Sequence, residues 1–122
     1  MTSPFKIETS TRDKLSIVAL VGHVDAHTAP RFEEVVAAEL AAGRRQIVID
    51  CTGLTYISSA GLGVFMSYIE DIRAQGGDLK ICGVIPKVQG TFEILGFPEI
   101  FDILPDLEAA VRRFRDVPVR QG

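Results

Sequence analysis

Apolar positions along the chain follow two spacings, one typical of strands and one typical of helices. Residues 5–9 alternate apolar and polar side chains, and residues 15–21 form an apolar run around one serine. Both segments are therefore predicted to be strands joined by a polar turn at 11–14. Gly22 ends the second run, and the short β-branched segment 46–51 is predicted as a central strand buried on both faces.

Four segments carry apolar residues at the three- and four-residue spacing of an amphipathic helix. These predicted helices run from the N-cap Thr28 to Gly43, from near Ser59 to Gly76-Gly77, from 86 to 95 and from 106 to 115. Short apolar strands at 79–82 and 101–104 fall between the later helices. The order predicts an α/β fold with a mostly parallel central sheet of about five strands, whose first strand is antiparallel, and about four helices.

Composition and charge limit the possible functions. The 122 residues suit one domain that builds its own core, because 47% are apolar and 24% are charged. A net charge of −3 gives no broad basic surface, so we expect no direct nucleic-acid binding. The apolar run at 15–21 is too short to cross a bilayer, and the first residues do not resemble a signal peptide. We expect a soluble cytoplasmic protein without membrane insertion.

Two thiols and two imidazoles are the residues that could suggest metal or redox chemistry. Cys51 and Cys82 each lie in or beside an apolar run, as buried thiols do in a reducing compartment. His23 and His27 make a poor metal site by themselves and are interpreted as loop residues. The chain lacks a phosphate-binding P-loop, a dinucleotide fingerprint and a nucleophile-elbow serine. We therefore expect no metal, no cofactor, no catalytic residue and no enzymatic activity.

The most informative segment is Ile57-Ser58-Ser59-Ala60-Gly61-Leu62-Gly63. Its two serines stand directly before a predicted helix, where backbone amides are unpaired and the helix dipole is positive. A phosphate attached there would find hydrogen-bond donors. The small residues that follow leave the helix end accessible to another protein. Serine is also an ordinary N-cap, so the residues alone leave both a capping role and a functional role open.

This segment, following an apolar strand, resembles the signature of STAS domains, a family named for sulfate transporters and anti-sigma factor antagonists. Further matches are Gly22-His23-Val24-Asp25-Ala26-His27-Thr28-Ala29, Gly76-Gly77-Asp78-Leu79, and the group Phe92, Leu95, Gly96 and Phe97. The first of these is similar to the family's loop before the first helix. The matches occur in the family's order along essentially the whole chain, which identifies residues 1–122 as a single STAS domain.

The resemblance implies a phosphorylation switch. In bacterial regulators of this family, a partner that is both anti-sigma factor and serine kinase phosphorylates the serine two positions before the helix glycine. Matching Gly61 places that position at Ser59. The unphosphorylated regulator binds this kinase and frees the sigma factor, the phosphorylated one lets go, and a separate serine phosphatase of the PPM type resets it. The partner-binding residues implied are Asp25, Ser58, Ser59, Ala60, Gly61 and Gly63.

Three questions stay open at the level of sequence. The best-known sporulation and stress regulators carry Asp where this chain has Ser58, so Ser58 is a second choice for the modified residue. Asp25 either shapes the partner surface or forms a turn before the first helix. The alternative function is a non-switching STAS module in another complex, for signalling or lipid transport. We expect the free protein to be a monomer.

Overall fold

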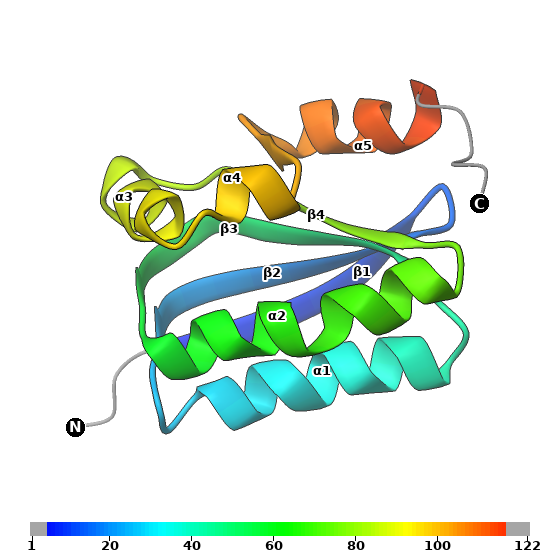
Figure 1. The fold of residues 1–122 in the computed structure, drawn as a ribbon. Helices are drawn as coiled ribbons and strands as arrows, with labels where there is room; N and C mark the ends of the chain where they lie inside the picture. Colours follow the sequence, from blue (N-terminus) through cyan, green and yellow to red (C-terminus); the bar gives the residue numbers. More distant parts are fainter. Residues whose placement is uncertain (1–4, 117–122) are drawn as a thin grey trace.

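The computed structural model describes residues 5–116, which form one mixed sheet with helices on both faces (Figure 1). The strands are β1 (Phe5–Arg12), β2 (Leu15–Val24), β3 (Gln46–Ile57), β4 (Asp78–Cys82) and β5 (Ile103–Leu104). The helices are α1 (Ala29–Ala41), α2 (Ser59–Ala74), α3 (Pro86–Ile94), α4 (Phe97–Ile100) and α5 (Leu107–Asp116). The strands lie in chain order, β1 antiparallel to β2 and the others parallel. The predicted fold class is confirmed.

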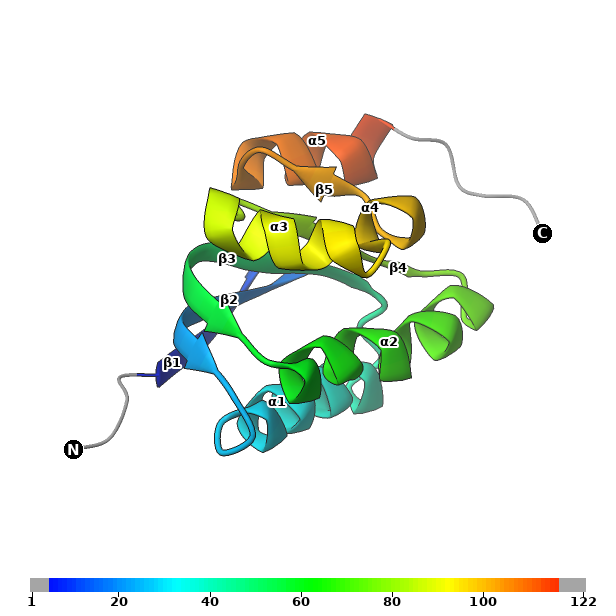
Figure 2. The ribbon, with the colours of Figure 1, turned by 60° about the vertical axis from the view of Figure 1, so that its left-hand side comes forward.

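Two layers of buried apolar side chains hold the helices to the sheet. Helices α1 to α4 contribute to the larger layer, and α5 packs on the opposite face of the sheet (Figure 2). Phe65 of α2 is at the centre of the larger layer. Its ring lies 5.2 to 5.9 Å, centre to centre, from those of Phe32, Phe92, Phe97 and Phe101. These edge-to-face contacts join α2 to α1, α3 and α4 and fix its position over the sheet.

Strand β3 is longer than the hydrophobic pattern predicted. The segment 52–56, expected to be a loop, continues the strand to Ile57. The pairing of β3 with β2 gains one extra β3 residue between Asp50 and Gly53 and another between Leu54 and Tyr56. Each β-bulge breaks the alternation of buried and exposed side chains, so the segment does not read as a strand.

Three smaller boundaries also differ from the sequence predictions. β2 continues through Gly22, which adopts a positive φ of 95°, so His23 is a strand residue and its interpretation as a loop residue is wrong. Gly96, with φ of 74°, ends the third helix and allows the short helix α4, which the pattern did not predict. The last strand, predicted over 101–104, contains only Ile103 and Leu104, the two residues that pair with β4.

The two cysteines are buried, as predicted, but on opposite faces of the sheet. Cys51 belongs to the layer under α1 and α2, whereas Cys82 belongs to the layer under α5. Their side chains therefore point in opposite directions and cannot form a disulfide with each other. Burial raises the pKa of the Cys51 thiol well above its usual range, and burial together with Asp50 raises the pKa of Cys82 to about 12. Both thiols are neutral near pH 7.

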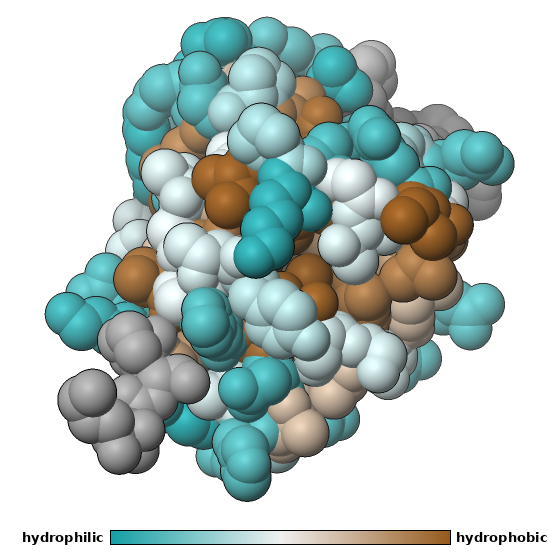
Figure 3. All heavy atoms as spheres, turned by 90° about the vertical axis from the view of Figure 1, so that its left-hand side faces the viewer, coloured by the Kyte–Doolittle hydropathy of each residue, from teal (hydrophilic) through white to brown (hydrophobic). Residues whose placement is uncertain are grey.

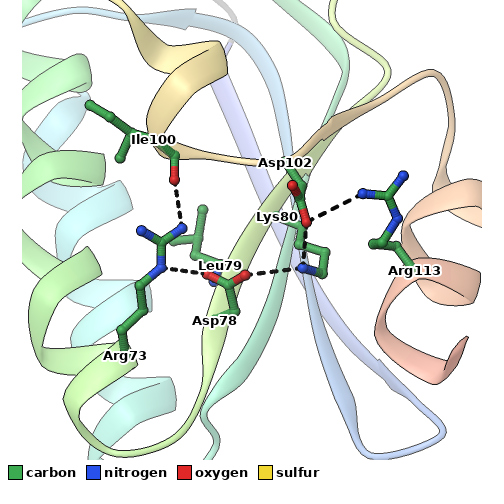
Figure 4. A network of polar contacts seen from close by, with 7 residues as sticks. All are labelled: Arg73, Asp78, Leu79, Lys80, Ile100, Asp102 and Arg113. Carbon is green, nitrogen blue, oxygen red and sulfur yellow. Dashed lines mark hydrogen bonds and ion pairs between the residues drawn. The ribbon is translucent and has the colours of Figure 1, made fainter. Parts of the chain in front are cut away.

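The C-terminal end of α2 is tied to its neighbours through Arg73 (Figure 4). The Arg73 Nε lies 3.0 Å from the Oδ1 of Asp78, at the start of β4. Its Nη2 donates to the carbonyl oxygen of Ile100 at 2.6 Å, at the end of α4. One side chain thus links α2, β4 and α4.

The same network includes a buried lysine. The Lys80 side chain is 6% exposed, and its Nζ lies 3.0 Å from Asp78 Oδ2 and 2.8 Å from Asp102 Oδ2 (Figure 4). The ammonium group also lies 4.6 Å from the ring centre of Phe114 on α5, and Arg113 of the same helix is 3.6 Å from Asp102. These contacts compensate the buried charge and fasten α5 to the sheet.

Candidate functional site

The residues predicted from separate motifs meet at the carboxyl ends of β2 and β3. Val24 and Ile57 form the last pair between these strands, and the amide of Ser58 donates to the carbonyl of Val24 at 2.8 Å. Asp25 directly follows the first strand and Ser58 directly follows the second. Asp25 therefore lies at the same end of the sheet as the two serines.

Asp25 organises the turn before α1. Its Oδ1 accepts hydrogen bonds from the amides of His27 at 2.9 Å and Thr28 at 3.1 Å. Thr28 holds the N-cap position but makes no side-chain cap bond, and its hydroxyl instead donates to the carbonyl of His23 at 2.8 Å. Partial burial acts to raise the pKa of Asp25, but these amide bonds outweigh it and hold that pKa below its usual value. The structure shows the turn role for Asp25.

Ser58 is the N-cap residue of α2 by backbone geometry alone. Its backbone is extended and its carbonyl accepts from the amide of Leu62 at 3.0 Å, as a helix cap requires. The Ser58 hydroxyl nevertheless makes no cap bond: its Oγ is buried and has no hydrogen-bond partner among residues 5–116. Side-chain capping, the ordinary explanation for a serine here, is not observed.

Ser59 is the first residue of α2 and is exposed. In the described part of the chain, the amides of Ser59, Ala60 and Gly61 donate to no acceptor, since the first amide bond of the helix comes from Leu62. The first turn also contains no acidic side chain. The exposed Ser59 therefore lies beside free amides at the positive end of the helix dipole.

The two glycines of the first turns have different roles. A Cβ on Gly61 would lie 2.6 Å from Val24 Cγ1 and 2.7 Å from Ile57 Cγ1, so only glycine lets α2 approach the ends of both strands. A Cβ on Gly63 would meet nothing within 4 Å, and this residue is exposed. Packing thus explains why residue 61 is glycine. Gly63 instead leaves the surface beside Ser59 without a protruding side chain.

Exposed apolar side chains near this site were missed at the level of sequence. Tyr56, two residues before Ser58, is 43% exposed, and its ring lies 5.7 Å from that of His23 on the neighbouring strand. Met66 of α2 is 44% exposed. Figure 3 faces this end of the sheet and shows apolar patches among polar residues. The exposure of Tyr56 could not be predicted, because the bulges of β3 interrupt the alternation of buried and exposed side chains along the strand.

Other features of the described chain lie apart from this site. An open hollow of about 470 Å³ lies between α3, β5 and α5, where Gln89, Asp102 and Arg113 line it, and it includes none of the predicted site residues. Within residues 5–116, no group of three or more His, Cys, Asp or Glu side chains could hold a metal ion. No helix in this range is long and apolar enough to cross a membrane.

Comparisons with known proteins agree with this architecture. BtrV of Bordetella bronchiseptica is 38% identical over 103 residues, which cover 84% of this chain and 89% of BtrV. The anti-sigma-B factor antagonist of Staphylococcus aureus is 32% identical over 97 residues, which cover 80% of this chain and 90% of that protein.

Solved structures share the fold. An anti-sigma factor antagonist from Mycobacterium paratuberculosis superposes with a TM-score of 0.85 at 24% identity, over 93% of this chain and 96% of that one. The unphosphorylated form of SpoIIAA gives 0.78 at 21% identity, over 94% and 99% of the two chains. Residues 6–110 match the family described as STAS domain. This chain therefore belongs to the STAS domain family.

Proposed function

We propose that this protein, a single STAS domain over residues 1–122, is an anti-sigma factor antagonist that is switched by phosphorylation of Ser59. Unphosphorylated, it binds an anti-sigma factor with serine kinase activity, and the sigma factor is released. The observation that carries the proposal is the exposed Ser59 hydroxyl at the start of α2, flanked by free amides and by exposed Ala60 and Gly63. The name of the Staphylococcus aureus relative supports it.

The chemistry of the switch is phosphoryl transfer. The Ser59 Oγ attacks the terminal phosphorus of ATP, a new P–O ester bond forms, and the bond to ADP breaks. The hydroxyl proton passes to a base on the kinase. A serine phosphatase of the PPM type later hydrolyses the ester. The antagonist itself contributes no catalytic group and works in the cytoplasm as a monomer when free.

The physical basis of release is the cost of burying charge. Phosphorylation adds about −1.5 to −2 charges near pH 7. In the complex this group would lie in the middle of the surface formed by Ser59, Ala60 and Gly63, where water is excluded. Desolvating it against a partner that offers no cation costs several kcal/mol, and each 1.4 kcal/mol lowers affinity about tenfold.

The test is to incubate the purified protein with ATP and each candidate anti-sigma kinase from its own genome, then to map phosphate by peptide mass spectrometry. We expect one phosphate on Ser59, none on Ser59→Ala, and a phosphate still on Ser59 in the matched variant Ser58→Ala. Phosphate on Ser58 alone would move the switch by one residue and contradict the assignment. Absence of phosphate, with tight binding to another assembly, would favour the non-switching STAS module.

A further inference from the structure

The Ser58 hydroxyl has a position that costs stability in the unmodified protein. Its Oγ is buried and unpartnered among the described residues, although the backbone conformation is the one in which an N-cap serine normally bonds to the helix. A buried hydroxyl without a partner costs about 1 to 3 kcal/mol. Any state of the protein that brings an acceptor to this helix end would remove that cost.

Several unused donors belong to adjacent residues at this point of the fold. The amides of Ser59, Ala60 and Gly61 open α2 without acceptors within residues 5–116, and the Ser58 hydroxyl precedes them by one residue. A phosphate on Ser59 brings three strong acceptor oxygens to the same helix end. These oxygens can accept more hydrogen bonds than the backbone amides alone provide. Rotation of the Ser58 side chain about χ1 lets its hydroxyl reach one of them.

We propose that the Ser58 hydroxyl is the hydrogen-bond donor that holds the phosphate of phosphorylated Ser59. The inference rests on the proposed function, because it requires a phosphate at Ser59. Ser58 is a positioning residue: its Oγ–H donates to a phosphate oxygen while the first-turn amides hold the others. A carboxylate at position 58 would only accept hydrogen bonds and would repel the phosphate, so the neutral hydroxyl favours retention of the phosphorylated state.

The consequence is measurable on the phosphate itself. A hydrogen bond donated to the dianion stabilises it over the monoanion and lowers the second pKa of the phosphate. Phosphoserine is incorporated at position 59 of the full chain by an expanded genetic code, and the phosphorus resonance is titrated by NMR. We expect Ser58→Ala to raise this pKa by about one unit, which corresponds to one charge-assisted hydrogen bond.

A matched control is available in the same chain. Ser16 of β2 also has a buried hydroxyl without a partner in the described structure, but it lies at the amino end of its strand, away from α2. Ser16→Ala should leave the phosphate pKa unchanged. An identical pKa in the parent and Ser58→Ala proteins would overturn the proposal.

Thermal unfolding gives a second, independent readout with opposite signs. Ser58→Ala should leave the unmodified protein as stable as before or more stable, because it removes an unsatisfied group and no bond. The same change should lower the Tm of the protein with phosphoserine at 59. A loss of Tm in the unmodified protein would indicate an ordinary cap and contradict the proposal. Because no kinase is used, these results do not depend on whether the kinase modifies Ser59.

Discussion

The two ends of α2 use their polar groups in opposite ways. At the C-terminal end, Arg73 contacts Asp78 and the Ile100 carbonyl, and the buried Lys80 extends the network to α5. At the N-terminal end, the amides of Ser59, Ala60 and Gly61 and the hydroxyl of Ser58 have no partner in the described structure. One end therefore holds the fold together, while the other keeps its donors for groups that come from outside. Under the proposed function, stability and binding are separated along a single helix.

This comparison leads to a simple expectation for mutations. Changes at the tied end should alter the free energy of unfolding without altering partner affinity in the folded protein. Changes at the exposed N-terminal surface should do the reverse. Gly61 lies between the two cases, because it belongs to the site by position and to the core by its contacts with Val24 and Ile57.

The largest effect is expected at Lys80. Lys80→Ala removes the cation that Asp78 and Asp102 share and should lower the free energy of unfolding by about 3 kcal/mol. This is the lower end of the range for buried pairs, because the Asp102 side chain is 40% exposed and each carboxylate keeps an arginine. Urea denaturation measures the change. Arg113→Ala, a partly exposed control at 3.6 Å from Asp102, should cost less than about 1 kcal/mol.

Gly61→Ala should have the next largest effect. The added methyl group would collide with Val24 and Ile57, so α2 must shift away from the strand ends at a cost of about 2 kcal/mol. The helix propensity of alanine offsets only part of that cost. Denaturant unfolding reports the loss, and unchanged stability would show that α2 does not need this close approach.

Gly63 provides the opposite case. Gly63→Gln should raise stability by less than about 1 kcal/mol, because glutamine is the better helix former and meets no neighbour. It should weaken binding to the anti-sigma kinase at least about tenfold, because the glutamine side chain would protrude from the surface beside Ser59 and prevent close contact. Isothermal calorimetry measures the affinity. Ala74→Gln, an exposed substitution at the other end of α2, is the control, and equal losses in the two variants would contradict a local contact.

The smallest expected effect is the pH dependence of the Asp25 turn. Its lowered pKa means that the ionised carboxylate stabilises the folded state at pH values above the unfolded pKa of about 4. That contribution is lost as the pH falls through the lower folded pKa. The Tm difference between the parent protein and Asp25→Asn should therefore be largest above about pH 5 and shrink toward pH 2. A difference that grows on acidification would contradict the assignment.

The sequence predicted the order of strands and helices because each helix keeps its apolar spacing and most strands are short apolar runs. The site was predicted for a different reason: Ser58 to Gly63 are contiguous, so one motif contains them. Asp25 could be added because the ends of neighbouring parallel strands share one edge of the sheet.

Features that depend on three-dimensional contacts were not predictable in this way. The bulges of β3 depend on how it pairs with β2, and the buried Lys80 depends on Asp102, 22 residues later. The unpartnered hydroxyl of Ser58 is the clearest case. Sequence rules assign an N-cap serine a bond to the helix, and only the side-chain geometry shows that the bond is absent.

The central claim is that the N-terminal end of α2 binds the partner only while Ser59 carries no phosphate. The most direct measurement is the affinity of the cognate anti-sigma kinase for two forms of the full chain, with serine or with phosphoserine at position 59. The account predicts that the phosphorylated form binds at least about a hundredfold more weakly, a difference of roughly 2.7 kcal/mol. Equal affinity of the two forms would contradict it.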